Sequence, residues 1–406
     1  MIATAAHAVV TALLLFTLPF HAVGLYSVAL VVLARLAPRR NTHSDAPVPA
    51  TPRLALLVVA HDEEQVIAES VKSLVALRYP AGAHAVIVVA DRCTDRTAEH
   101  ARAAGGRVLE RRDGPGGKSA AVAFGVEALS GEGFDAMAVF DADNVADVDF
   151  LEAIALRLAT AEVVQGFVDS KNPGASWVAG SSALGFWAIA EMAQAPRERL
   201  GLSTPLMGTG FVMSMELARR VLTTGGGLTD DLDLAARLAP LGVRVAYEAR
   251  ARTVDEKPTR LGTAVAQRHR WMQGRWAVAS QHVPALVREA LSGSRGRRWT
   301  LLDVAFQLLA PSLLFTAVAT ALLAVTAIAV DGFAGLAAPR GVLLSLAFAG
   351  VYYAVPAAGI ARHRPGAAVW LCYLFQPFYL VLSLPLAVTG FVTRRDRRWV
   401  RTPKGA

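Results

Sequence analysis

The sequence predicts an α/β domain with a mostly parallel sheet, flanked by apolar segments long enough to cross a membrane. Three observations support this prediction. From Arg53 to Tyr247, short apolar runs alternate with helical segments, as in chains whose helices cross over between parallel strands. Three of the runs end in acidic clusters. The hydrophobic fraction of 54% is high for a soluble enzyme, which indicates membrane segments beside a soluble part.

The chain begins with an apolar segment. Residues 1–34 contain no Asp, Glu, Lys or Arg, and the apolar run is longer than the roughly 20 residues that span a bilayer. A cleaved signal peptide is the competing interpretation, but the segment lacks a basic start and arginines follow it. We expect residues 1–37 to be a transmembrane anchor whose carboxyl end faces the cytosol. Residues 38–52 are then a proline-rich linker.

The soluble domain is expected to span residues 53–298, with interfacial helices near its end. The strand candidates are Leu54–Val59, Val86–Ala90, Arg107–Leu109, Ala136–Phe140, Val163–Val168 and Val243–Tyr247. Helical patterns lie between several of them, for example at Glu63–Ala76 and Asp95–Ala104. In open α/β sheets, ligands bind outside the carboxyl ends of the strands. The residues that follow each run are therefore candidates for a functional site.

Acidic residues follow three of the predicted strands. The first strand runs into His61-Asp62-Glu63-Glu64, the second into Asp91, and the fourth into Asp141-Ala142-Asp143. Carboxylates at i and i+2 across a turn can converge on one hard cation, and Mg²⁺ binds one or two carboxylates together with water and substrate phosphates. A solvated turn that caps the next helix is the alternative for the last pair. The regular placement of three acidic clusters at strand ends favours a site along one edge of the sheet.

The glycine-rich stretch from Gly114 to Ser119 resembles a phosphate loop at first sight. Only two residues, not four, separate its first glycine from the Gly-Lys pair, so it is not a Walker A sequence. Lys118 at a helix start still suits a phosphate. An ordinary turn with an exposed lysine is equally consistent with this stretch alone.

Two later stretches can be interpreted either structurally or functionally. In Thr229-Asp230-Asp231, the threonine is suited to cap a helix and acids stabilise its first turn, but one carboxylate exceeds what capping requires and can serve as a base. In the stretch that holds Gln267, Arg270 and Trp271, Arg and Trp are expected of a helix lying on lipid. Arginine also neutralises a departing pyrophosphate, and tryptophan stacks on the apolar face of a sugar.

The last part of the chain is apolar again. Residues 304–330, 341–361 and 365–393 each lack Asp, Glu, Lys and Arg, which predicts a transmembrane or interfacial region over residues 299–393, followed by a basic tail at 394–406. Three full spans would place this tail outside, against the positive-inside rule, so the third run is a span, a re-entrant segment or an interfacial segment.

The composition restricts the partners. The net charge is +8, but the basic residues lie largely beside apolar runs and carry no recognised nucleic-acid motif, which favours a lipid bilayer over nucleic acid. Cys93 and Cys372 are too few and too far apart for a disulfide framework or a zinc site.

Taken together and in order, these motifs resemble those of the membrane-bound inverting glycosyltransferases of family 2, a group that includes cellulose, chitin and hyaluronan synthases and ceramide glucosyltransferase. The resemblance covers about residues 53–280. It implies a Rossmann-like GT-A fold, a nucleotide-sugar donor, most simply a UDP-sugar, and Mg²⁺ or Mn²⁺ as cofactor. Asp230 departs from the family pattern, in which Glu is usual at this position.

The resemblance also implies a role for each motif residue. Asp231 is the catalytic base, and Asp141 and Asp143 bind the metal. The predicted donor contacts are Glu63, Asp91, Lys118, Asp141 and Arg270, and the predicted acceptor contacts are Gly208, Thr209, Gly210, Asp230, Gln267 and Trp271.

The implied product is a β-linked polysaccharide or glycan, built by an integral protein of the plasma (inner) membrane with its catalytic domain in the cytosol. A single-transfer enzyme acting on a lipid acceptor shares all these motifs and is the alternative. A membrane scaffold with an inactive transferase domain is an alternative of another class, disfavoured because every expected carboxylate is present in the sequence.

Overall fold

The computed structural model describes residues 2–38, 51–222, 230–293, 295–309, 320–329 and 339–395. The predicted linker and the predicted basic tail therefore lie almost entirely outside the described residues, as does Thr229.

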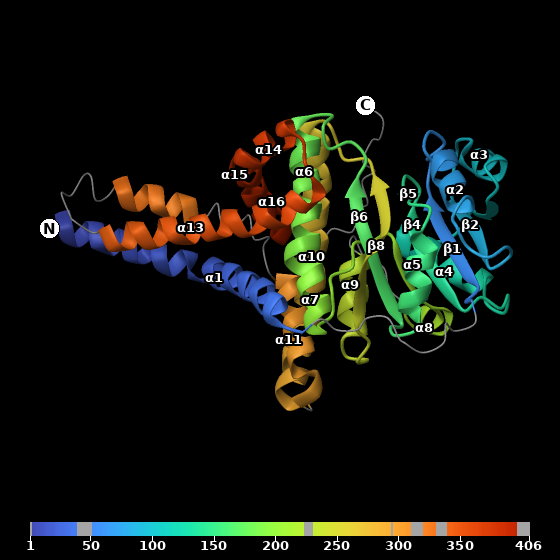
Figure 1. Ribbon diagram of the computed structural model, residues 1–406, viewed down its shortest axis with the longest axis horizontal. Helices are drawn as coiled ribbons and strands as arrows, with labels where there is room; N and C mark the ends of the chain where they lie inside the picture. The colour runs from blue at the N-terminus through green and yellow to red at the C-terminus, as the bar shows by residue number, and fades with distance from the viewer. Residues whose placement is uncertain are drawn as a thin grey trace.

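A mixed eight-stranded sheet forms the half of the molecule on the right of Figure 1, with the strand order β3-β2-β1-β4-β7-β6-β8-β5. Its strands are β1 (Leu54–Ala60), β2 (His84–Asp91), β3 (Arg107–Arg111), β4 (Ala136–Asp141), β5 (Val145–Ala146), β6 (Val163–Ser170), β7 (Phe211–Ser214) and β8 (Val245–Asp255). The pairs β1–β2, β1–β4, β2–β3 and β6–β8 are parallel, whereas β7 runs antiparallel to both β4 and β6.

All six predicted strands are present. Two further strands, β5 and β7, were not predicted, and the last strand extends beyond its predicted end at Tyr247. The two missed strands are too short to show a period. The last strand continues from Tyr247 to Asp255 because its charged side chains are paired: Glu248 binds Arg250, and Arg252 binds Asp169 of the neighbouring strand. Because of β7, only the half of the sheet from β3 to β4 is purely parallel.

Helices cover both faces of the sheet. Alternate side chains of a strand point to opposite faces, so Leu56 and Val58 join one core cluster and Ala55 and Leu57 the other. The first cluster packs against α2 (Ile67–Val75), α3 (Thr97–Ala103) and α5 (Phe150–Leu158), and the second against α4 (Lys118–Ala128), α8 (Met215–Val221) and α9 (Asp230–Leu238). Burial on both faces explains why the first strand is a continuous apolar run.

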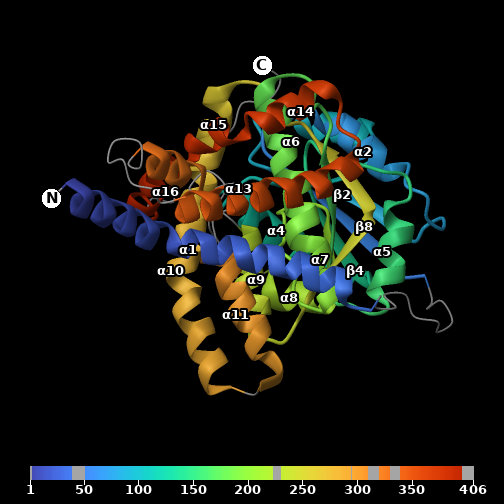
Figure 2. The same cartoon turned by 60° about the vertical axis from the view of Figure 1, so that its left-hand side comes forward.

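The other half of the molecule is helical. Its elements are α1 (Ile2–Leu36), α6 (Trp177–Ile189), the π-helical turn η1 (Ala190–Gln194), α7 (Ala195–Leu200), α10 (Leu261–Ser292), α11 (Arg295–Leu309), α13 (Pro339–Ile360), the short 3₁₀ turn η2 (Ala361–His363), α14 (Ala367–Leu374), α15 (Gln376–Val381) and α16 (Ser383–Val392). In Figure 1, α6, α7 and α10 stand between the sheet and the pair α1 and α13, which extends away from it. Figure 2 shows α10 and α11 as a hairpin that projects from one end of the molecule.

Within the described residues, one helical stretch, Leu15–Leu36, is long and apolar enough to cross a membrane. The pair Ala367–Leu374 and Gln376–Val392, bent by 60°, adds a second if it forms one span, so the span and re-entrant interpretations of 365–393 both stay open. In the predicted run 304–330, α11 ends at Leu309 and a separate short apolar helix covers Thr320–Ala329.

Candidate functional site

A single cavity of about 1520 Å³ opens where β1, β2 and β4 end, between α4, α9 and α10. Every predicted site residue except Gly210 lines it. The acidic ends of three strands and the Gln267–Trp271 stretch of α10 therefore face one space, although more than 200 residues of chain separate the first from the last.

The Asp141–Asp143 turn follows β4 directly and is held from below by buried polar side chains. The backbone N–H of Asp141 donates to Asn144 Oδ1 (3.0 Å) and to Thr209 Oγ1 (3.1 Å), and the Thr209 hydroxyl donates to Asn144. Thr209 is only 3% exposed, and its side chain supports this turn. The acceptor contact expected of it stays a prediction. Gly210 lies outside the cavity, and its N–H donates to the Val139 carbonyl in the sheet (2.8 Å).

The first two residues of α4 join two acidic motifs. The Lys118 ammonium donates to the Asp141 carboxylate and to the Gly208 carbonyl (2.6 Å). The next side chain, Ser119, donates to the Asp230 carboxylate. Ser119 was not among the predicted site residues, and its place beside Lys118 in the glycine-rich stretch was the available signal.

A second polar cluster lies at the ends of β2 and β3. Asp91 is 3% exposed, and its carboxylate accepts from Arg111 and lies 3.4 Å from the Nε of Arg92. His61 contacts the Asp91 carbonyl oxygen through Nδ1 (2.7 Å), and Glu63 lines the same end of the cavity. Neither arginine was predicted as a site residue, because only acidic residues at strand ends were considered as candidates.

Asp231 lies in the first turn of α9, deep in the cavity. Burial raises the pKa of its carboxyl to about 6; repulsion by Asp230 adds to the rise, while the Leu232 N–H and the charges of Lys118 and Arg275 oppose it. A carboxylate with a pKa just below neutrality is well suited to take up a proton during a reaction near pH 7.

The long helix α10 presents one face to the cavity. Gln267, Arg270 and Trp271 lie three and four residues apart, which places them on the same side of the helix. Burial lowers the pKa of Arg270, and the charge of Asp141 opposes this shift, so the guanidinium faces the carboxylate turn. The Trp271 ring packs against Phe186 of α6 with 6.4 Å between the ring centroids.

The end of β8 brings a further ion pair that the sequence analysis missed. Asp255 binds Lys257, whose side chain is 3% exposed. Burial raises the pKa of Asp255 to about 6; Lys257 opposes the rise, and Asp143 and Asp141 add to it. Because β8 runs parallel to β4 through β6 and β7, its carboxyl end reaches the same edge of the sheet.

Asp141 and Asp143 offer the donor set of a Mg²⁺ or Mn²⁺ site. The Asp141 side chain is 42% exposed, toward a cavity that also holds the cations Lys118 and Arg270. Two carboxylates with room for phosphate oxygens and water match what Mg²⁺ takes from proteins. The residues therefore fit a metal that also binds a diphosphate.

Another group of potential ligand atoms, from Asp62, Cys93 and Asp95, lies within 4.8 Å of one another. Asp62 already accepts from the Thr94 N–H (2.6 Å), and Asp95 accepts from the Thr97 N–H (2.9 Å), so local turns account for both carboxylates. We assign no ion to this group.

The sequence profile of glycosyltransferase like family 2 matches residues 52–274, which is more than half of the chain and includes every strand of the sheet. The chain belongs to glycosyltransferase family 2. This confirms the prediction of family 2, and the mixed α/β sheet is the GT-A fold of that family. The membrane-bound, inverting type stays a prediction.

Curated relatives of this family 2 chain include lipid-glycosylating enzymes. It is 32% identical over 252 residues to the beta-monoglucosyldiacylglycerol synthase of Synechocystis sp., a match that covers 57% of this chain and 49% of that protein. It is 27% identical over 237 residues to the probable glycosyltransferase YdaM of Bacillus subtilis, covering 55% of each. The chain thus spans about half the length of the curated relatives it matches.

Among solved structures, the family 2 chain is similar to the mannosyltransferase PcManGT from Pyrobaculum calidifontis, which was solved in complex with GDP-Man and Mn²⁺. The TM-score is 0.58 at 20% identity, and the match covers 96% of this chain and 100% of the other. This likeness shows a shared fold over the sheet and most of the helical half.

Proposed function

We propose that this protein is a metal-dependent, inverting glycosyltransferase that moves a sugar from a nucleotide-sugar, expected to be a UDP-sugar, to a hydroxyl group of a lipid acceptor. One observation carries the proposal. The cavity that holds Asp141, Asp143 and Asp231 continues to apolar walls formed by Phe16 of α1 and by Val388 of α16. A polar donor site and an apolar acceptor site thus share one continuous space.

The chemistry follows from the placement of the charged groups. Asp231 takes the proton of the acceptor hydroxyl as the oxygen forms a bond to the anomeric carbon. The bond from that carbon to the diphosphate breaks on the opposite face, so the configuration inverts. The leaving nucleoside diphosphate carries the negative charge away toward Lys118 and Arg270, which line the same cavity. A divalent cation held by Asp141 and Asp143 supplies further positive charge there.

The donor orientation follows from the order of groups along the sheet edge. We expect the nucleoside end to bind beside Asp91, which Arg111 fixes, and the diphosphate to bind beside Lys118 and the Asp141–Asp143 turn. Attack by the acceptor then comes from the side of Asp231 and Trp271.

The sequence motifs favoured a polysaccharide product and left a glycosylated lipid as the alternative. We now favour the glycosylated lipid. The apolar cavity walls belong to α1 and α16 of the helical half, and an alkyl chain entering from a bilayer would require such walls. The relative from Synechocystis sp. is named for a glucosyl-diacylglycerol product, which supports the same choice. We place α1 across the membrane as an anchor and the catalytic domain in the cytosol, at the plasma (inner) membrane.

Purified protein in detergent tests this proposal. It is incubated with a panel of UDP-sugars, Mg²⁺ or Mn²⁺, and either diacylglycerol or no added lipid. UDP release and product mass are followed, with Asp231→Asn as the inactive control. We expect lipid-dependent UDP release and a product one sugar heavier than the lipid. A polymer formed without added lipid would favour the polysaccharide synthase, and no release with any sugar would favour the inactive scaffold.

A further inference from the structure

Arg275 is one of the cations that line the cavity without belonging to a predicted motif. Arg275 lies on α10, four residues after Trp271 and therefore on the same side of the helix. Among the described residues it forms no ion pair with a carboxylate. Its Nη1 donates instead to the carbonyl oxygens of Gln307 (2.7 Å) and Leu308 (3.4 Å).

These two carbonyls belong to the last turn of α11, which ends at Leu309. The last carbonyls of a helix have no partner within the helix and carry the negative end of its dipole, so they attract an arginine. They fix the Arg275 head group in place, and because they carry no full charge, they leave its positive charge available to other groups.

The end of α11 is itself held firmly. Asp303 is 3% exposed and accepts two bonds from Arg197 of α7, at 2.8 Å and 2.9 Å. It also accepts the Tyr26 hydroxyl of α1 (2.6 Å) and the Gln307 side chain (3.0 Å). In Figure 1 the carboxyl end of α1 meets α7 and α11 at this point. The support of Arg275 is thus fixed by contacts from α1 and α7 and by one contact within α11.

Three charged groups that line the cavity act on the pKa of Asp231: Asp230 from its own helix, Lys118 from α4 and Arg275 from α10. Lys118 is already paired with Asp141, and Asp230 repels a charge on Asp231. Arg275 shares the cavity with Asp231, on a helix that packs against α9, and no carboxylate in the described part of the chain neutralises its charge directly.

We propose that Arg275 is a positioning residue that keeps the Asp231 carboxylate in its charged, proton-accepting form. It acts through its charge, at a place set by the end of α11. This inference rests on the proposed role of Asp231 as the base. It assigns a function to a side chain outside the Gln267–Trp271 stretch.

The expected consequence has a definite sign. A nearby cation favours the charged form of a carboxyl and lowers its pKa, so loss of that cation raises the pKa of Asp231. A larger fraction of Asp231 is then protonated below neutrality, and the rate at low pH falls while the rate at high pH is kept.

The test compares the pH dependence of kcat for the wild type with that of Arg275→Gln, Arg275→Lys and Arg288→Gln. Arg288 is exposed on the same helix and serves as the control for loss of one charge. For Arg275→Gln we expect the acid limb to move up by roughly 0.5–1 pH unit, less than the 1–3 units typical of a charge pair in contact. Arg275→Lys and Arg288→Gln should keep the wild-type limb, and the KM for the nucleotide-sugar should not change.

An acid limb in Arg275→Gln identical to that of the wild type, with only a lower Tm, would show that Arg275 caps α11 and does nothing more. If that variant does not fold, Arg275→Lys still decides, because an upward shift of its limb despite the retained charge contradicts the inference. Failure of the proposed function is distinguished by Asp231→Asn, which would then turn over at the wild-type rate.

Discussion

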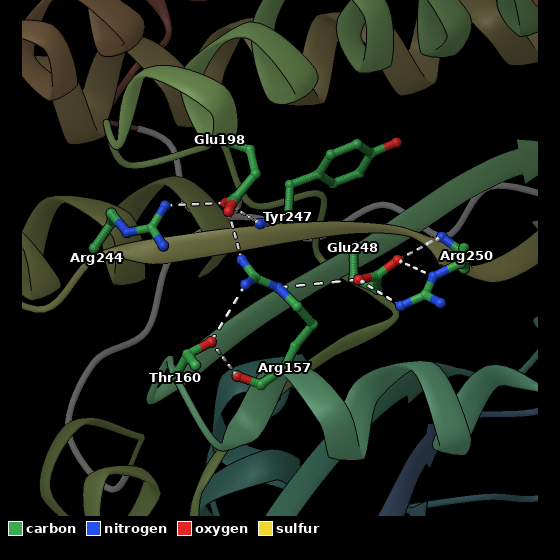
Figure 3. Close-up of polar contacts among 7 residues, drawn as sticks. All are labelled: Arg157, Thr160, Glu198, Arg244, Tyr247, Glu248 and Arg250. Carbon is green, nitrogen blue, oxygen red and sulfur yellow. Dashed lines mark hydrogen bonds and ion pairs between the residues drawn. The ribbon is translucent and has the colours of Figure 1, made fainter. Parts of the chain in front are cut away.

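Arg197 and Glu198 are consecutive residues of α7, yet they form buried ion pairs with two different parts of the molecule. Arg197 binds Asp303 of α11 at 2.8 Å, and Glu198 binds Arg157 of α5 at 2.5 Å. Figure 3 shows that Glu198 also accepts the backbone N–H of Tyr247 in β8, at 2.8 Å. The short helix α7 therefore fastens the helical half of the molecule to the catalytic sheet.

Loss of one partner of this pair should be costly. Arg157 is 1% exposed, and Glu198→Gln leaves its charge without its closest carboxylate. Breaking a buried pair in this way typically costs about 3–5 kcal/mol. We expect a clear fall in Tm, measured in detergent. Glu69→Gln, which breaks the exposed pair with Lys171, should change the Tm little, and an equal effect of the two variants would show that the buried pair has no special weight.

Activity should require a divalent cation. A chelator should abolish UDP release, and added Mg²⁺ or Mn²⁺ should restore it. The two carboxylates and the departing diphosphate are all negatively charged, so a divalent cation is needed between them. Asp143→Asn should stay inactive at every metal concentration while keeping the wild-type Tm. Asp149→Asn, a surface carboxylate paired with Arg78, is the matched control and should respond to metal as the wild type does. Full activity in chelator would contradict the metal site.

Asp231→Asn should lower kcat by roughly 10²–10⁴-fold, the usual contribution of general-base catalysis, with little change in donor KM. The pKa of Asp231, raised to about 6 by burial, also sets the pH dependence. Below about pH 6 the carboxyl is protonated and cannot accept the acceptor's proton, so kcat should fall as the pH drops through this value. A group with a pKa of about 6 changes charge between roughly pH 5 and 8. A kcat that does not change over this range would argue against Asp231 as the base.

Arg270→Lys should abolish sugar transfer without releasing the protein from membranes. Lysine keeps the charge but cannot reproduce the forked contact of a guanidinium with a diphosphate. Sugar transfer and membrane sedimentation are measured side by side. Arg288→Lys, on the exposed side of the same helix, should leave both unchanged. Wild-type transfer by Arg270→Lys would mean that α10 serves only as an interfacial anchor.

Phe16→Ala should raise the KM for a lipid acceptor and leave the KM for the nucleotide-sugar as it is, because Phe16 lines the apolar part of the cavity. Leu15→Ala removes the neighbouring side chain of α1, which does not line the cavity, and should change neither constant. Equal KM values for the lipid in the wild type and Phe16→Ala would weaken the assignment of this wall to the acceptor.

The sequence by itself determined the strands of the parallel half and the residues at their ends. A continuous apolar run is a local property, so the first strand and the acidic residues that follow it, Glu63 among them, can be recognised without a structure. Because parallel strands end at one edge of a sheet, Asp91 and Asp141 were also predicted as neighbours. The spaced motifs then identified the family.

Only the tertiary structure decided which side chains meet across the chain. The contact between Ser119 and Asp230, the hydrogen bond from the Asp141 N–H to Thr209, and the placement of Arg275 in the cavity that holds Asp231 all depend on how distant segments pack. Asp255 reached the site because an antiparallel strand, too short to be recognised, sets the direction of β8. Local patterns fix what each segment forms, but pairing depends on packing between segments far apart in sequence, which no short window of sequence contains.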